Sequence, residues 1–259
     1  MNTLLPLTGA PLKTLMADRG NLSKVLTTKL IENLNSGDSR TRCDSARELG
    51  ERVKKGRVKE QLKVEAVINA LIDALTHKDL MTAQAADNAL VQIGKPAIPA
   101  LYKLLYEGND HQRESVLICL GNMREKAREA LQAIRAVVRE NDETIKVRLA
   151  AVWALGNIVS KLGDSEETKS VVMEISNMLK TDSTDMLLCA TEALGKLGAR
   201  AKGAEQDIEP LLEHENDTVK NTAKWALTQI NPNGAKGIKP VYKEINIREL
   251  LKRIEDDNN

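Results

Sequence analysis

The sequence predicts an all-α, right-handed solenoid of about six helix pairs with a C-terminal capping helix. Three observations predict it: a recurring motif, a helix-capping residue at a fixed distance before each copy, and a scarcity of aromatic residues. Aromatic residues make up 2% of the 259 residues, whereas apolar residues make up 42%. A single compact core of this size normally contains several large aromatic fillers. We therefore expect thin aliphatic layers between stacked helices.

The recurring motif contains a leucine, and these leucines are 41, 30, 35, 39 and 33 residues apart. Such periods are typical of helical solenoids. The leucines are Leu49, Leu90, Leu120, Leu155, Leu194 and Leu227. Eleven residues before them stand Asp38, Asp79, Asn109, Thr144, Ser183 and Asn216. Side chains of these types accept hydrogen bonds from the first turn of a helix, so each copy is predicted to be a capped helix.

Each capped helix is predicted to follow an antiparallel partner helix. In the fourth copy, one buried stripe is formed by Val147, Ala151, Ala154, Leu155 and Ile158. The preceding helices are expected to end near Leu34, Leu75, Leu105, Val138, Leu179 and Leu212. Short turns between the two helices force antiparallel packing. Pro96 and Pro99 suit the first turn of a helix, whereas Pro210 falls late and predicts a short or kinked helix.

The ends of the chain differ from the repeats. We expect an N-terminal extension at residues 1–21, the solenoid at 22–230, and a linker with the capping helix at 231–259. Residues 1–20 and 231–240 are predicted to be partly disordered. Ile247, Leu250, Leu251 and Ile254 share one helical face, which is expected to cover the last pair. No stretch approaches the roughly 20 apolar residues that cross a bilayer, and a cytoplasmic location is predicted.

The capped helices resemble the HEAT-repeat family, including the HEAT-like repeats of bilin lyases. The family pattern is D-x-x-V-R-x-x-A-x-x-A-L-G. It is matched by Asp38 with Arg42, and by Val147, Arg148, Ala151, Ala154, Leu155 and Gly156. The resemblance covers roughly residues 22–230 and implies that the second helix of each pair lines a concave side. It says little about the ligand, because one fold hosts many functions.

A partner-binding surface is predicted on the side of the capped helices that faces away from the buried stripe. Position nine after the cap carries both tryptophans of the chain, Trp153 and Trp225. The predicted site comprises Ile118, Asn122, Leu149, Trp153, Asn157, Leu188, Trp225 and Gln229. Its apolar members would provide affinity, since tryptophan is enriched in interface hot spots, and its amides would bind the partner's backbone. Exposed apolar groups with a polar rim mark binding sites.

Trp153 and Asn157 also look like the W-x-x-x-N array by which armadillo-type importin alpha proteins hold extended peptides. Only the fourth copy has both residues, so recognition of nuclear signals is not carried over. The alternative interpretation is that the tryptophans are ordinary repeat residues that pack across neighbouring helices. Both interpretations stay open at the level of sequence.

The predicted function is a non-enzymatic scaffold that binds another protein or an extended peptide on its concave surface. One alternative is a nucleic-acid or phosphate-binding module that uses Arg47, Lys54 and Lys55, since nine basic residues stand against four acidic ones between Arg40 and Lys63. A solvated loop explains this segment equally well. A second alternative is a lyase-like accessory subunit. No catalytic motif, metal-ligand pattern or cofactor motif occurs, and the oligomeric state stays open.

Overall fold

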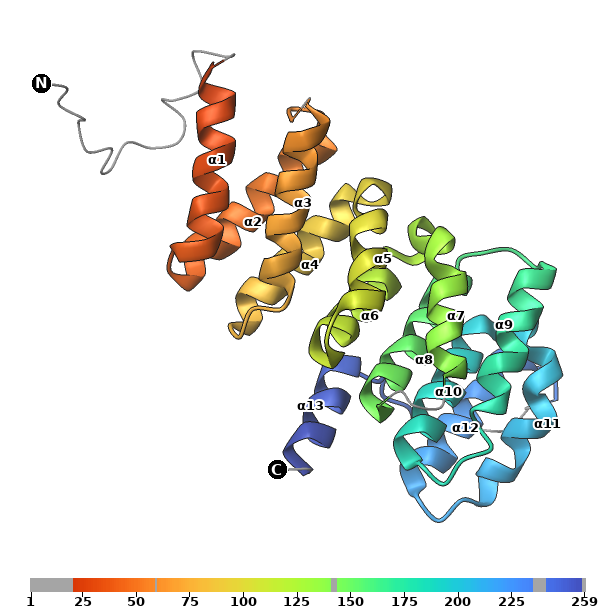
Figure 1. Cartoon of the computed structure of the whole chain (residues 1–259). Coiled ribbons are helices and arrows are strands. Elements are labelled where there is room, and N and C mark those ends of the chain that lie inside the picture. Colours follow the sequence, from red (N-terminus) through yellow and green to blue (C-terminus); the bar gives the residue numbers. More distant parts are fainter. Residues whose placement is uncertain (1–20, 59, 141–143, 235–240, 258–259) are drawn as a thin grey trace, which may run out of the picture. The chain divides into compact units, whose positions relative to one another are not determined.

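The computed structural model describes residues 21–58, 60–140, 144–234 and 241–257. These residues form α-helices and short 3-10 helices, and no strand occurs among them (Figure 1). The predicted all-α fold class is therefore confirmed. Residues 1–20 and 235–240, for which disorder is predicted, lie outside the described residues. The handedness of the solenoid, its concave side and the domain boundaries stay predictions.

The chain divides into two compact units, Met1–Ile93 and Gly94–Asn259. In the first unit, α1 (Asn21–Ser36) packs against α2 (Ser39–Lys54), and α3 (Gln61–Leu75) packs against α4 (Leu80–Ile93). The pairs stack because α1 also contacts α3 and α2 contacts α4. Leu49 and Leu90, the motif leucines of this unit, are completely buried.

The second unit, described by itself, contains four helix pairs and a final helix. Its first helices are α5 (Ile98–Glu107), α7 (Leu131–Arg139), α9 (Glu166–Asn177) and α11 (Glu205–Ile208). Its second helices are α6 (Asp110–Met123), α8 (Ile145–Val159), α10 (Thr184–Leu197) and α12 (Asp217–Ile230), and α13 spans Ile247–Asp257. Short 3-10 helices complete the first helices: η2 (Lys95–Ala97), η3 (Arg124–Ala130), η4 (Gly198–Ala204) and η5 (Glu209–Glu213). As predicted from Pro210, α11 is short and passes directly into η5.

The predicted capping residues stand at the N-terminus of every second helix. Asp38, Asn109, Ser183 and Asn216 accept hydrogen bonds from backbone N–H groups of the first turn. Asp79 accepts from the N–H of Met81 at 3.2 Å. Thr144 is the exception, because it occupies the N-cap position of α8 without a side-chain hydrogen bond. The capping register thus positions all six second helices.

Glycines near the ends of the second helices allow neighbouring helices to approach closely. A Cβ added to Gly50 would lie 2.8 Å from Cβ of Ala89, and one added to Gly156 would lie 2.7 Å from Cβ of Ala193. Carbon atoms pack best at about 3.5–4.0 Å. The motif glycine is therefore required by the spacing between consecutive second helices.

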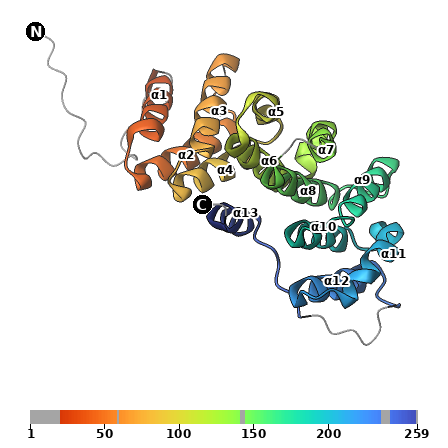
Figure 2. The ribbon, with the colours of Figure 1, turned by 60° about the horizontal axis from the view of Figure 1, so that its bottom comes forward.

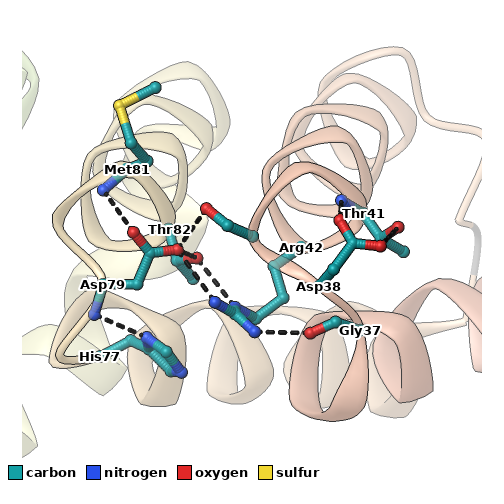
Figure 3. Close-up of polar contacts among 9 residues, drawn as sticks. Gly37, Asp38, Thr41, Arg42, His77, Asp79, Met81 and Thr82 are labelled. Atoms are coloured by element: carbon teal, nitrogen blue, oxygen red, sulfur yellow. Dashed lines mark hydrogen bonds and ion pairs between the residues drawn. The ribbon is translucent and has the colours of Figure 1, made fainter.

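A network of side-chain hydrogen bonds joins the two second helices of the first unit (Figure 3). The guanidinium of Arg42 on α2 donates to the carboxylate of Asp79 at 2.9 Å and to the hydroxyl of Thr82 at 2.9 Å. Asp79 also accepts from the hydroxyls of Ser39 and Thr82, and these hydrogen bonds lower the pKa of its carboxyl well below the usual value. Arg42 and Asp79 thus connect one repeat to the next through their capping regions.

Candidate partner-binding surface

The predicted site residues lie on four second helices of the second unit, α6, α8, α10 and α12. We call the side of these four helices that faces away from the first helices the second-helix surface. The expectation that its apolar residues are exposed was wrong for three of them, since Ile118 is 4%, Leu149 0% and Leu188 7% exposed. Consecutive second helices contact each other along their flanks, so residues beside the central stripe are buried as well. Their assignment to a binding site stays a prediction.

Trp153 is half-buried on α8 and packs on the preceding second helix. A Cβ added to Gly121 of α6 would lie only 2.5 Å from Cζ3 of the Trp153 indole. The indole Nε1 is buried and has no hydrogen-bond partner among the described residues. These contacts favour a packing role for Trp153.

Trp225 has the same packing contact and a second one. A Cβ added to Gly195 of α10 would lie 2.3 Å from Cζ3 of the Trp225 indole. In addition, the ring of Tyr242 stacks on the indole with centroids 3.9 Å apart and an interplanar angle of 8°. Tyr242 belongs to residues 241–256, which we call the tail. Trp225 is therefore contacted by the chain's own C-terminal segment.

The tail is also held by a carboxylate and an ammonium group on α10. The buried Glu192 accepts a hydrogen bond from the backbone N–H of Ile245 at 2.7 Å. Lys196 lies between two carboxylates, at 2.6 Å from Glu192 and 2.9 Å from Glu244 of the tail. Burial lowers the pKa of Lys196, but the two carboxylates outweigh it and the pKa is raised. Lys196 therefore remains cationic beside the tail.

The last part of the tail is the amphipathic helix α13, which contacts α8 (Figure 2). Ile247, Leu250, Leu251 and Ile254 are buried, as their spacing predicts. The helix was expected to cover the last pair, but it packs two pairs earlier, on the side of α8 opposite α7 (Figure 2). An apolar stripe specifies that a face is buried and not which helix buries it, which accounts for the difference.

One ion pair and one cluster of three charged residues involve α13. Arg253 pairs with Asp185 at the start of α10. Lys146 on α8 lies 3.6 Å from Glu255 of the tail and 3.5 Å from Glu114 on α6. Burial raises the pKa of Glu114, against the opposing effect of Lys146. Charged residues from three second helices thus frame the tail.

The three predicted amides occupy different environments. The side chain of Asn157 donates to the backbone carbonyl of Trp153 at 3.0 Å, within its own helix. Asn122 and Gln229 are exposed at the ends of α6 and α12. Asn157 is therefore bonded within its own helix, while the exposed Gln229 side chain donates to the hydroxyl of Thr228 at 3.3 Å.

The predicted anion-binding residues lie in the first unit, where acidic neighbours accompany two of them. Arg47 pairs with Asp44 at 2.8 Å and Lys55 pairs with Glu51 at 2.5 Å. Lys54 is exposed. In the same helix, Arg42 is engaged with Asp79 (Figure 3). Arg47 and Lys55 are therefore each paired with a carboxylate of their own helix, the segment keeps an excess of basic residues, and its role as an anion site stays a prediction.

The contribution of the tail to this surface was missed by the sequence reasoning. Glu192 stands at position nine and Lys196 at position thirteen after the cap of α10, the same registers that single out Trp153 and Asn157. The available signal was Glu192, a carboxylate at position nine after the cap, where two other copies carry tryptophan. Cys189 on α10 is buried with its thiol against the carbonyl of Leu149, and burial raises the pKa of the thiol.

Comparisons with known proteins agree with the repeat architecture. Residues 27–121 match the family model for HEAT repeats. A designed armadillo repeat protein in complex with the peptide (KR)4 aligns with a TM-score of 0.50 at 20% identity, covering 78% of this chain and 98% of that chain. At this identity the likeness shows the fold alone.

Two other solved structures are similar at lower TM-scores. An engineered protein from a structural genomics consortium aligns with a TM-score of 0.48 at 25% identity, covering 80% of this chain and 98% of its own. An archaeal HEAT-like repeats protein from Thermococcus onnurineus NA1 aligns with a TM-score of 0.46 at 20% identity, covering 81% of this chain and 88% of its own. A search of curated proteins gave no match.

The described helices include none that is long and apolar enough to span a membrane. The helix pairs, their capped second helices and the family match together confirm the predicted resemblance. The chain contains HEAT repeats, placed by the family model at residues 27–121, in an all-α fold similar to that of the designed armadillo repeat protein.

Proposed function

We propose that the chain is a non-enzymatic protein-interaction scaffold whose second-helix surface binds an extended segment of a partner protein. One observation carries this proposal: α10 and α12 already hold a non-helical segment, residues 241–246 at the beginning of the tail. Trp225 stacks on Tyr242, and Glu192 accepts the backbone N–H of Ile245. The surface thus has the groups that an extended protein segment requires.

The chemistry of these contacts is suited to protein segments in general. An extended chain has unpaired backbone N–H groups, and a carboxylate is a strong acceptor for them. Stacked aromatic rings contribute about 0.5–1.5 kcal/mol beyond the area that they bury. Because the second helices are fixed by their caps and by packing, a partner would bind to a preorganised surface, which lowers the cost of association.

The fold itself is compatible with this role. The designed armadillo repeat protein of similar fold is in complex with the peptide (KR)4. The phosphate-binding alternative is not proposed, because Arg47 and Lys55 are paired with neighbouring carboxylates. The lyase-like alternative stays a prediction from the sequence.

The proposal is tested by selecting displayed peptides on the full chain carrying Tyr242→Ala and Glu244→Lys. These substitutions remove two tail contacts and leave α8, α10 and α12 unchanged. We expect peptides whose affinity falls about tenfold or more with Glu192→Gln or Trp225→Ala, because a hydrogen bond to a charged group contributes about 1.5–3 kcal/mol.

Met173→Ala is the matched control, since this side chain is 67% exposed on α9, a first helix. Its substitution should leave binding unchanged. Circular dichroism melts establish that each variant is folded. Failure to select any peptide, or binding that ignores both Glu192→Gln and Trp225→Ala, would contradict the proposed function.

A further inference from the structure

The tail contacts the second-helix surface through a short pattern of side chains. Tyr242 and Glu244 are two residues apart, and both side chains contact the second-helix surface. The first stacks on Trp225 and the second pairs with Lys196. Between them and α13, the N–H of Ile245 donates to Glu192. Three successive contacts therefore recognise an aromatic residue, an acidic residue and the backbone.

The tail is held on the second-helix surface by ion pairs and by the apolar face of α13. Each of its ion pairs has an exposed member in the tail, with Glu244 70%, Glu255 62% and Arg253 56% exposed, and a less exposed partner on a second helix, at 20–23%. Exposed ion pairs contribute only about 0–1 kcal/mol each. The apolar face of α13 supplies the burial. Such a segment can be displaced by another with the same pattern without dismantling the helix pairs beneath it.

The charges of the surface also set a preference. Lys196 is flanked by Glu192 on its own helix and by Glu244 of the tail. A segment with lysine or arginine in place of Glu244 would bring two cations together, and like charges at close range disfavour the wrong partner. Tyr242 lies near Glu192, and burial and this carboxylate raise the pKa of its phenol, so the ring is neutral.

We infer that the second-helix surface recognises protein segments with an aromatic residue followed two positions later by an acidic residue, and that the tail is the resident copy which such a partner displaces. This inference rests on the proposed function and adds the chemistry of the partner and its competition with the tail. A partner with the pattern gains the Trp225 stack and the Lys196 ion pair only after the tail has left.

The test uses a fluorescently labelled peptide of residues 241–256. It is titrated into the full wild-type chain and into the full chain carrying Tyr242→Ala and Glu244→Lys. Apparent affinity scales with the fraction of molecules in which the surface is open. We expect about tenfold or more tighter binding to the substituted chain. Glu244→Lys alone serves as a second variant, because this exposed side chain can be replaced without disturbing the core.

A charge exchange tests the specificity. Lys196→Glu, combined with Tyr242→Ala and Glu244→Lys, should reverse the preference, so that a peptide with Glu244→Lys binds more tightly than the original peptide. Lys202→Glu is the control, because it makes the same charge change at an exposed position of η4. It should leave the preference as it was.

Several outcomes would overturn the inference. These are equal binding to both chains, an unchanged preference after Lys196→Glu, or failure of the peptide to bind a folded Glu244→Lys chain. Dimers of the wild type that form with rising concentration and that Glu244→Lys abolishes would also overturn it, because the tail would then occupy the surface of a second copy. If selected peptides depend on Glu192 and lack the pattern, the inference fails while the proposed function stands.

Discussion

Gly195→Ala tests whether the glycine of α10 is needed to make room for the Trp225 indole of the next second helix. The added methyl group would lie 2.3 Å from Cζ3 and 2.9 Å from Cε3 of Trp225, and 3.0 Å from Cα of Ala226. Because carbon atoms pack best at about 3.5–4.0 Å, the indole would have to retreat by about 1.2 Å and the α12 backbone by about 0.5 Å. The substitution therefore acts on both neighbours at once.

The expected effect follows from two opposing contributions. Overpacking of this kind costs about 1–3 kcal/mol, and the contact with backbone favours the upper end because Ala226 Cα cannot rotate away. Replacing glycine by alanine inside a helix raises the free energy of unfolding by about 1 kcal/mol. The net loss in the free energy of unfolding is therefore about 2 kcal/mol, which corresponds to about 4–8 °C in the melting temperature for a unit of this size.

The assay is urea denaturation of Gly195→Ala, Trp225→Ala and the double variant, followed by circular dichroism. Trp225→Ala removes the ring that the new methyl group meets, so the cost of Gly195→Ala should shrink by about 1–2 kcal/mol in that background. Gly203→Ala is the control, because nothing lies within 4 Å of its added Cβ. An equal cost of Gly195→Ala in both backgrounds would refute the reasoning.

Three further predictions concern groups away from the tryptophans. Arg200→Lys should lower the free energy of unfolding by about 1.5–3 kcal/mol in urea titrations, because the guanidinium of Arg200 donates to the carbonyls of Val159 at 3.1 Å and Ser160 at 2.9 Å. Asp79→Asn should remove an acid-sensitive contribution to stability. The folded pKa of Asp79 lies below 3.8, so its contribution is complete above pH 3.8 and is lost as the pH falls toward the folded pKa; melts across this range would show a wild-type loss that the variant lacks. Glu114 has a folded pKa above 4.5, so its contribution declines as the pH rises from 4.5 through the folded pKa, and the melting temperature of Glu114→Gln should rise relative to wild type over that interval.

Much of the repeat architecture was predictable from local chemistry. Capping residues at one register marked every second helix, because a side-chain acceptor is needed wherever backbone N–H groups lack partners. Thr144 shows the limit of this reasoning, since it occupies the cap position of α8 and makes no side-chain hydrogen bond. The residue type identifies where a helix begins, but rotamer and neighbouring chain decide whether the bond forms.

The surface was less predictable than the helices. The position of a residue in a helix gives the direction of its side chain. It does not predict which segments from elsewhere in the chain pack against that side chain. Leu149 points away from the stripe of its own pair and is nonetheless completely buried, because α8 has second helices on both flanks and α13 against it. Likewise, the stripe of α13 predicted its buried face, but its partner helix depends on contacts between residues far apart in sequence.

Packing and binding are not exclusive roles for the tryptophan register. Trp153 and Trp225 each lie on a glycine of the preceding second helix, so both are fixed by the spacing of the repeats. A ring has two faces and an edge, and an indole held against a glycine can still contact another group. In Trp225 that further contact is made by Tyr242, a residue outside the repeats. The rigid indole that completes one interface therefore also presents a ring to the segment of the same chain that lies upon it, without any change in the repeat.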